Sequence, residues 1–263
     1  MANKNHRTTP YVIALCHQKG GVAKTTTALS LSACFNELGL ETLLIDLDPQ
    51  GNSTSAMGMN PNAMLHSAAD VLLGNGSLAG ISRETATPGL DLIPSNNDMQ
   101  TVERCLHLRS GFEHLLREQF SRSSLAHYKV VVIDCPPALG SIATTVLTAS
   151  DMVIVPTQCE FFSMQGIRST LKLINTIRTK TNAQLDARLL ITMFDQRIGL
   201  HYLSLEHIRR TFKHTVLKTI IGVDGKLRES QMTNKLITAY APRSRAAEQY
   251  RQLTQELLKY VQN

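Results

Sequence analysis

Residues 11–26 read Tyr11-Val12-Ile13-Ala14-Leu15-Cys16-His17-Gln18-Lys19-Gly20-Gly21-Val22-Ala23-Lys24-Thr25-Thr26. An apolar strand, a glycine-rich turn, a Lys-Thr pair and a helix form, in this order, the arrangement that holds a nucleoside triphosphate. Small residues allow backbone N–H groups to surround the phosphates, and the helix predicted over residues 25–38 directs its positive N-terminus at them. We expect Lys24 to reach the β- and γ-phosphate oxygens and the Thr25 hydroxyl to ligate Mg²⁺.

The loop departs from the ordinary phosphate-binding pattern, because Gln18 and Ala23 stand where that pattern has glycine. It fits the form K-G-G-x-x-K-T and resembles the deviant Walker A loop of the ParA- and MinD-like ATPases. The resemblance implies a homodimer in which Lys19 crosses to the partner's ATP and Lys24 contacts the ATP of its own chain. It also implies ATP contacts along the loop, at Lys19, Gly20, Gly21, Val22, Ala23, Lys24, Thr25 and Thr26. A methyl group at position 23 is compatible with a helical φ and is strained at a positive φ.

Two further predicted strands end in carboxylates. One runs into Asp46-Leu47-Asp48-Pro49-Gln50-Gly51-Asn52, and the other is Val130-Val131-Val132-Ile133-Asp134 followed by two prolines. Carboxylates beside a phosphate-binding loop fit a site for Mg²⁺ and water, whereas a single Asp also serves as a turn former. The family resemblance implies that Asp48 positions the attacking water, that Asp46 supports Mg²⁺ and its water shell, and that Asp134 holds Mg²⁺ through a water.

Composition places the chain among globular proteins of one domain. It has 263 residues, of which 43% are hydrophobic and 18% charged. Its first ten residues are polar and basic, without the apolar region of a signal peptide, and no apolar run has the length of a transmembrane helix. We therefore expect a flexible tail over residues 1–10, an ATPase domain over residues 11–263, and a cytoplasmic location. Five cysteines without C-x-x-C spacing indicate neither a disulfide framework nor a zinc site.

Apolar runs alternate with helical patterns along the chain. Strands are predicted at residues 12–16, 42–47, 90–93, 130–135, 152–155, 189–194 and 215–221. Helices are predicted at residues 25–38, 98–108, 111–120, 142–149, 163–180, 203–214 and 244–261, and residues 55–89 as a helical excursion or loop. This alternation predicts an α/β fold with one doubly wound, mostly parallel sheet covered by helices on both faces, and ligands at the carboxyl ends of its strands.

The resemblance extends from about residue 11 to residue 258 and is closest to the short ParA/Soj-like partition ATPases. Lys226-Leu227-Arg228-Glu229 stands where many members carry R-L-S-E, and the segment from Tyr240 to Ala247 resembles Y-D-P-x-S-x-x-A, which makes Pro242 a candidate ATP contact. The resemblance implies a nucleoid-associated ATPase of slow intrinsic turnover, stimulated by a ParB-like or other cargo-adaptor protein. It leaves the cargo open: a plasmid, a chromosome origin, a carboxysome or a chemoreceptor cluster.

The basic residues of the last third favour a polyanionic partner. The formal net charge is +6, and no aromatic residues are interleaved for base stacking. Together with the resemblance, this predicts nonspecific binding of double-stranded DNA through phosphate contacts, with Lys226, Arg228, Arg209 and Lys213 as candidates. Ordinary surface charge is the alternative for each of these residues.

Four other functions are weaker alternatives. A MinD-like ATPase that cycles on a membrane needs a C-terminal amphipathic helix with a basic face, but residues 250–261 are poor in Lys and Arg, so we expect no stable membrane binding. An electron-transfer relative needs cluster ligands, and Cys105 and Cys135 lack glycine-rich surroundings. An amidotransferase relative would need an added glutaminase domain. A non-catalytic binding module is disfavoured because Lys24, Thr25, Asp48 and Asp134 are all present.

Overall fold

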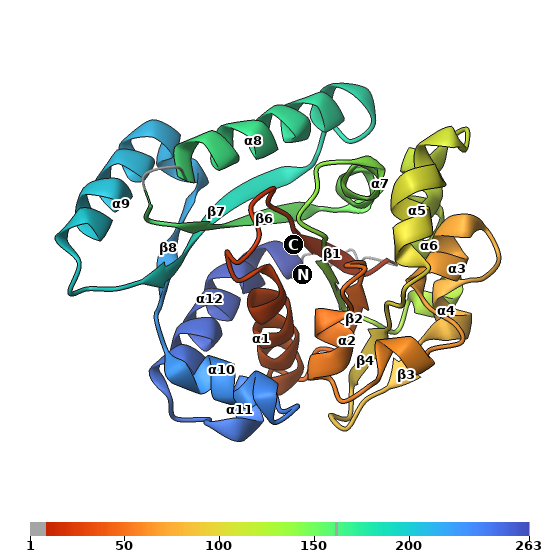
Figure 1. The fold of residues 1–263 in the computed structure, drawn as a ribbon, viewed down its shortest axis with the longest axis horizontal. Helices are drawn as coiled ribbons and strands as arrows, with labels where there is room; N and C mark the ends of the chain where they lie inside the picture. Colours follow the sequence, from red (N-terminus) through yellow and green to blue (C-terminus); the bar gives the residue numbers. More distant parts are fainter. Residues whose placement is uncertain (1–8, 161–162, 263) are drawn as a thin grey trace, which may run out of the picture.

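The computed structural model describes residues 9–160 and 163–262, and one eight-stranded sheet runs through it (Figure 1). The strand order is β3-β4-β2-β5-β1-β6-β7-β8, and every neighbouring pair is parallel except the antiparallel pair β3 and β4. The strands are β1 (Tyr11–Leu15), β2 (Thr42–Asp46), β3 (Arg83–Glu84), β4 (Leu90–Ile93), β5 (Val130–Asp134), β6 (Met152–Gln158), β7 (Asp186–Phe194) and β8 (Val216–Gly222). The predicted α/β fold with a mostly parallel sheet is confirmed.

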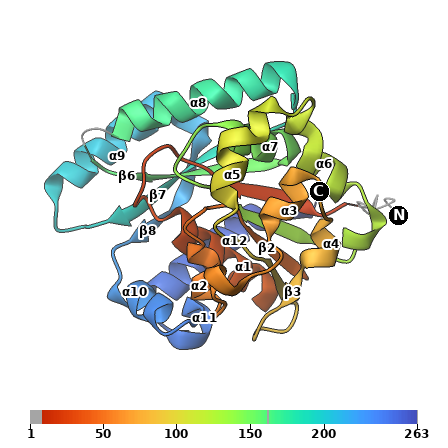
Figure 2. The ribbon, with the colours of Figure 1, turned by 45° about the vertical axis from the view of Figure 1, so that its right-hand side comes forward.

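Helices cover both faces of the sheet (Figures 1 and 2). One face carries α1 (Lys24–Glu37) and α12 (Arg245–Val261), with α10 (Gly225–Met232) and α11 (Ile237–Tyr240) packed beside them. The other face carries α3 (Ala68–Leu73), α5 (Met99–Cys105), α6 (Leu115–Phe120), α7 (Ser141–Ala149), α8 (Ser163–Lys180) and α9 (Gly199–Phe212). The short helices α2 (Asn52–Ala56) and α4 (Leu78–Ile81) follow β2 and α3.

The core consists of two apolar layers that the sheet separates. Alternate residues of β1 enter different layers, with Ile13 packed in the layer of α1 and α12, and Val12 in the layer of α7 and α8. All five residues of β1, β2 and β5 are buried, as expected for parallel strands covered on both sides. The carboxyl ends of these three central strands therefore meet at one edge of the sheet, where a ligand can bind.

Several elements differ from those predicted by the sequence. Residues 55–89 contain α3, α4 and the two-residue strand β3, and the predicted helix over 98–108 ends as α5 at Cys105 and continues as a 3₁₀ turn, Leu106–Leu108. Helices α2, α10 and α11 have no counterpart in the prediction, because each has at most eight residues and little apolar periodicity. Residues 1–8 of the expected tail lie outside the described residues.

The C-terminal helix α12 is docked on the sheet. Its apolar residues Tyr250, Leu253 and Leu257 are fully buried in the layer that also contains α1. The Tyr250 hydroxyl forms a hydrogen bond of 3.1 Å with the Thr27 hydroxyl of α1, and Arg251 forms an ion pair with Glu37. Its apolar face thus stabilises the fold. No helix among the described residues is long and apolar enough to cross a membrane.

Candidate nucleotide-binding site

The phosphate-binding loop connects β1 to α1, and the described chain adopts a left-handed conformation twice within it. Gly21 has φ 71° and Ala23 has φ 68°, and α1 begins at the next residue, Lys24. Neither residue 23 nor a side chain before it caps the first turn of α1. The backbone N–H groups of this turn are therefore available to an anion.

Ala23 has the positive φ at which its methyl group is strained. A left-handed conformation costs an L-residue about 1–2 kcal/mol, and glycine avoids this cost. Part of the gain is offset, because glycine makes the unfolded chain more flexible and so raises the entropy lost on folding. We expect Ala23→Gly to raise the free energy of unfolding by about 0.5–1 kcal/mol, which corresponds to an increase in Tm of about 1–4 °C. Thermal unfolding measures this. The control is Ala28→Gly, in the regular part of α1, which should lower Tm. A lower Tm for Ala23→Gly would contradict the account.

Lys19 lies at the start of the loop and contacts the end of β6. Its ammonium group donates a hydrogen bond of 3.1 Å to Gln158 Oε1 and forms an ion pair with Glu160. The Lys19 N–H donates to His17 Nδ1 at 2.9 Å. Burial, with a smaller contribution from the Lys24 charge, lowers the pKa of His17 to about 4, so this ring is neutral at pH 7 and can accept that bond. In this single chain, the side chain of Lys19 is thus held away from the nucleotide pocket.

Asp46 and Asp134 lie opposite one another on the neighbouring strands β2 and β5, and both are fully buried. Asp46 accepts hydrogen bonds from the Thr54 N–H (2.8 Å), the Thr54 hydroxyl (2.7 Å) and the Asp48 N–H (3.1 Å). Asp134 Oδ2 accepts from the Ser53 hydroxyl at 2.8 Å, whereas its buried Oδ1 has no hydrogen-bond partner among the described residues. The side chain of Asp134 therefore keeps one acceptor for a further ligand.

Burial raises the pKa of both carboxyl groups. The Asp134 charge raises the pKa of Asp46 further, and the Thr25 and Ser53 hydroxyls partly lower that of Asp134. A raised carboxyl pKa means that the folded state disfavours the ionised form, so ionisation of the pair lowers the stability of the fold. A divalent cation beside the pair would offset this cost.

The pocket at this edge of the sheet has a volume of about 560 Å³. Its floor is the phosphate-binding loop with Lys24, one wall is the segment after β2 with Asp48, and the other wall is α10 with Arg228. Figure 1 shows α2 and α10 on either side of the start of α1. The predicted site residues that line the pocket are Gly20, Gly21, Ala23, Lys24, Thr25, Thr26 and Asp48.

Five predicted residues of this site lie outside the pocket lining, and the first is Lys19, which contacts Gln158 and Glu160 as described above. Val22 is buried, and its carbonyl accepts a hydrogen bond of 3.1 Å from the Thr192 hydroxyl. Pro242 lines a separate depression with Lys226 and Arg243. Asp46 and Asp134 lie buried behind the loop. Among the described residues, no group of three or more His, Cys, Asp or Glu side chains is arranged to hold a metal ion.

The sequence analysis missed several polar residues that support the site. Ser53 and Thr54 of α2 bond to Asp134 and Asp46, and Ser95 donates to the Asp48 carbonyl at 2.7 Å. Gln158 donates to the Gly21 carbonyl at 3.0 Å, and Gln231 donates to the Thr26 hydroxyl at 2.9 Å. A signal for the first pair was available, because Ser53-Thr54 directly follows the acidic motif. The others come together only in the folded chain.

The four candidate DNA contacts fall into two pairs. Arg209 and Lys213 are exposed at the end of α9, whereas Lys226 and Arg228 lie on α10, on the other side of the sheet (Figure 2). Lys226 forms an ion pair of 2.7 Å with Glu229, and Arg228 lines the nucleotide pocket. The four side chains therefore do not form one continuous patch.

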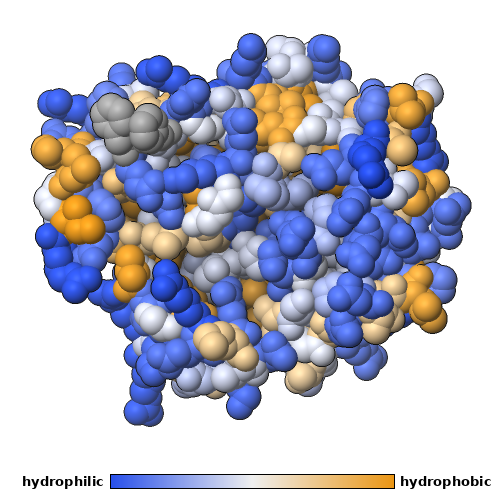
Figure 3. All heavy atoms as spheres, in the orientation of Figure 1, coloured by the Kyte–Doolittle hydropathy of each residue, from blue (hydrophilic) through white to orange (hydrophobic). Residues whose placement is uncertain are grey.

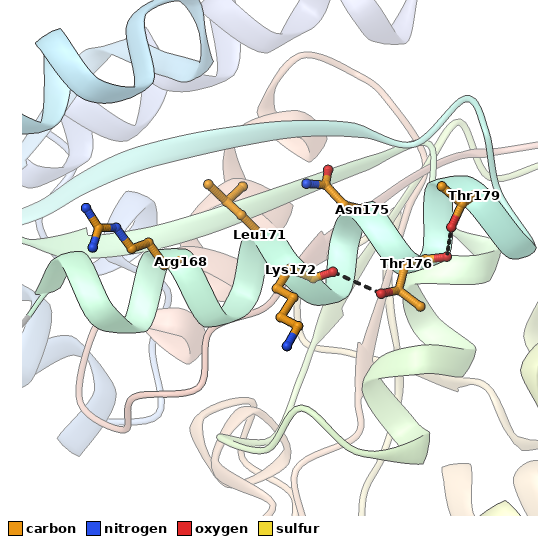
Figure 4. Close-up of a pocket in the computed structure, with 6 residues that line it drawn as sticks. All are labelled: Arg168, Leu171, Lys172, Asn175, Thr176 and Thr179. Carbon is orange, nitrogen blue, oxygen red and sulfur yellow. Dashed lines mark hydrogen bonds between the residues drawn. The ribbon is translucent and has the colours of Figure 1, made fainter.

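Two other surface features lie apart from this site. A shallow depression on α8 is lined by Arg168, Leu171, Lys172, Asn175, Thr176 and Thr179, all from that one helix (Figure 4). Its threonine hydroxyls, those of Thr176 and Thr179, bond to backbone carbonyls of the same helix. Exposed apolar side chains also gather near the start of α9, on the left of Figure 3: Ile198, Leu200, Tyr202 and Leu203.

The fold and this loop define a P-loop nucleotide-binding protein, and comparisons with known proteins agree. Residues 10–187 match a family described as an AAA domain. The sporulation initiation inhibitor protein Soj of Bacillus subtilis is 34% identical over 255 residues, which cover 94% of this chain and 97% of Soj. The chromosome partitioning protein ParA of Myxococcus xanthus is 32% identical over 94% of this chain and 88% of ParA. The chain therefore belongs to the Soj and ParA family.

A solved structure extends the comparison. Cobyrinic acid a,c-diamide synthase from Mycobacterium smegmatis, with a bound ATP analogue and magnesium, is similar with a TM-score of 0.84. It is 33% identical, and the match covers 95% of each chain. Relatives of comparable identity thus carry names for chromosome partitioning and for amide synthesis.

Proposed function

We propose that this chain is a Mg²⁺-dependent ATPase that positions or segregates DNA or another cargo. The observation that supports this most is the placement of Lys24, Thr25 and Asp48 in one pocket at the N-terminus of α1. A helix N-terminus and a lysine together bind phosphate groups. The relatives named for partition, and the solved relative with a bound ATP analogue, favour ATP as the ligand. Calorimetric titration with Mg-ATP tests the proposal, with the Lys24→Ala variant described in the Discussion.

The residues behind the loop fit Mg²⁺. Two observations favour a cation at this position: Asp134 Oδ1 has no hydrogen-bond partner among the described residues, and the pKa values of Asp46 and Asp134 are raised. Thr25, at the first turn of α1, would supply a hydroxyl ligand, and Asp134 would act through a water. Asp46 would support the ion indirectly, since its oxygens hold the backbone of Asp48 and Thr54 in place. Bound Mg²⁺ would neutralise charge on the phosphates.

Asp48 is placed to orient a water molecule. It is largely buried and lines the pocket, and its Oδ1 accepts a hydrogen bond of 2.9 Å from the Gln50 N–H. That bond holds the carboxylate at the turn that follows β2. Lys24 would neutralise the transferring phosphoryl group while Asp48 holds the attacking water. Turnover without a partner would be slow if a ParB-like or other adaptor protein must complete this arrangement.

We propose that ATP brings two chains together through Lys19. To reach ATP in a partner, the Lys19 side chain must first leave Gln158 and Glu160. Gly20 allows close approach of another chain, because a Cβ added there meets no atom within 4 Å in the single chain. The same openness makes Gly20 a suitable site for a variant, since an added Cβ has no close contact within its own chain.

Lys19→Ala and Gly20→Val should both block ATP-dependent dimerisation while retaining some nucleotide binding. Lys19→Ala removes the crossing charge, and Gly20→Val places a branched side chain at the interface. Light scattering with Mg-ATP measures the mass, and Lys129→Ala is the control, since Lys129 is exposed directly before β5, at the other end of that strand from the site. The same doubling of mass in both variants as in the wild type would refute the shared-site model.

The proposed polyanionic partner is duplex DNA of any sequence. Arg209 and Lys213 lie one turn apart at the end of α9, and Lys226 lies on α10. The chain would associate with the nucleoid through such contacts when ATP is bound. Because each phosphate contact releases counterions, affinity should fall steeply with salt.

The double variant Arg209→Ala, Lys213→Ala should weaken DNA binding on all sequences alike. The slope of log affinity against log salt should become shallower by about 2, or about 0.9 for each lost contact. Fluorescence anisotropy of labelled duplexes in ATP at several salt concentrations measures this, and the control Lys129→Ala removes one positive charge outside α9. An unchanged slope would show that these residues do not contact phosphates.

A MinD-like membrane cycle is the alternative that the structure favours less. The apolar face of α12 is buried against α1 and β8 and is not free to enter a lipid surface. Sedimentation with anionic liposomes separates the two proposals: we expect ATP to drive the chain onto DNA and not onto liposomes.

A further inference from the structure

Arg228 occupies an unusual position for a basic surface residue. It is exposed on α10, and it lines the pocket that also contains Lys24, Thr25 and Asp48. Among the described residues, no hydrogen bond or ion pair of its guanidinium group is found. Lys226, two residues earlier on the same helix, is instead paired with Glu229 and lines a different depression. Arg228 thus presents an uncompensated charge to the pocket.

Hydrogen bonds hold helix α10 against the start of α1, and they thereby determine the position of Arg228. The Asp224 side chain caps the helix by accepting from the Lys226 N–H at 2.9 Å, and it also accepts from the Ala246 N–H of α12 at 3.0 Å. Gln231 donates to the Thr26 hydroxyl at 2.9 Å. Residues three apart share one face of a helix, so Arg228 lies on the face that Gln231 holds against α1.

We infer that Arg228 contacts the bound nucleotide at the end shared by ATP and ADP, away from the γ-phosphate. The inference rests on the proposed function and adds a specific contact to it. Asp48, proposed to hold the attacking water, approaches the pocket from the segment after β2. Arg228 belongs to α10, which lies on the other side of α1 from α2 (Figure 1), and Gln231 of the same helix bonds to Thr26. An unpaired guanidinium group there fits the α-phosphate, because arginine binds phosphate oxygens with paired N–H donors.

The family pattern does not contain this residue. Arg228 stands where R-L-S-E has serine, and Lys226 stands where that pattern has arginine. The expectation that Arg228 binds DNA treated both residues as equivalent surface charges. The structure separates them, because only Arg228 lines the pocket.

Calorimetric titration of Arg228→Ala, Arg228→Lys and the control Lys129→Ala with Mg-ATP and Mg-ADP tests the inference. We expect Arg228→Ala to weaken the binding of both nucleotides by about 10- to 100-fold, the range of a lost hydrogen bond to a charged group. Arg228→Lys should lose less affinity, and Lys129→Ala should bind both nucleotides within about twofold of wild type. Arg228 is exposed, so the variants should keep the wild-type Tm.

Three results would overturn the inference. Affinities of Arg228→Ala within twofold of wild type would exclude a nucleotide contact, including the case where that variant loses only DNA binding. A loss for ATP without a loss for ADP would place Arg228 at the γ-phosphate instead. A wild-type chain that binds neither nucleotide would overturn the proposed function and this inference with it. A wild-type chain that binds both nucleotides, with unchanged affinity in Arg228→Ala, would overturn this inference alone.

Discussion

Lys24→Ala is expected to abolish detectable Mg-ATP binding. Lys24 is largely buried at the first residue of α1, and its ammonium group donates to the Lys19 carbonyl at 3.2 Å, so it already points along the loop. The variant loses charge-assisted bonds to phosphate oxygens, each worth about 1.5–3 kcal/mol. Several such bonds lost together correspond to an affinity loss of at least about 100-fold. Isothermal titration calorimetry with Mg-ATP measures this loss directly.

The control for Lys24→Ala must separate binding from folding. Lys24→Gln keeps most of the side-chain volume and removes the charge, so it should retain the wild-type circular dichroism spectrum while losing ATP affinity. Lys129→Ala should leave ATP affinity unchanged. ATP affinity in Lys24→Ala equal to that of the wild type would refute the assignment of the phosphate-binding loop.

Asp48→Ala is expected to trap an ATP-bound dimer with little turnover. A positioned carboxylate that orients water contributes about 10²–10⁴-fold to a rate, whereas Lys24 and the loop still bind the nucleotide. ATP hydrolysis should therefore fall by about 10²–10⁴-fold while the mass in ATP stays doubled. Phosphate release and light scattering on the same sample give the two quantities.

Asp48→Asn provides the matched variant for this prediction. Its side-chain oxygen can still accept the hydrogen bond from the Gln50 N–H, so the loop geometry is retained while the negative charge is removed. We expect Asp48→Asn to hydrolyse ATP as slowly as Asp48→Ala. Wild-type turnover in Asp48→Asn would show that the charge of Asp48 has no role in hydrolysis.

The larger elements of the fold could be predicted from the sequence because each has a strong local pattern. Helix α8 begins and ends where its apolar spacing predicts, at Ser163 and Lys180. The buried strands β2, β4 and β5 lie within one residue of their predicted bounds. The two-residue strand β3 has no periodicity to detect, and it forms only because it pairs with β4.

Those residues of the candidate site that belong to one sequence motif could be predicted. Those that the fold brings together from distant parts of the sequence could not. Lys24, Thr25 and Asp48 each belong to a recognisable string and lie together in the pocket. The support that Gln158 gives to Lys19 links residues 139 positions apart, and the position of Arg228 depends on how α10 packs. From the sequence it follows that Ala23 would be strained at a positive φ, but the φ itself is known only from the structure.

The proposed cycle depends most directly on whether ATP controls association of the chain. Light scattering of the wild-type chain with Mg-ATP, with Mg-ADP and without nucleotide is the decisive measurement. We expect twice the mass of a single chain in Mg-ATP, and the mass of a single chain with Mg-ADP and without nucleotide. The same mass in all three conditions would contradict it.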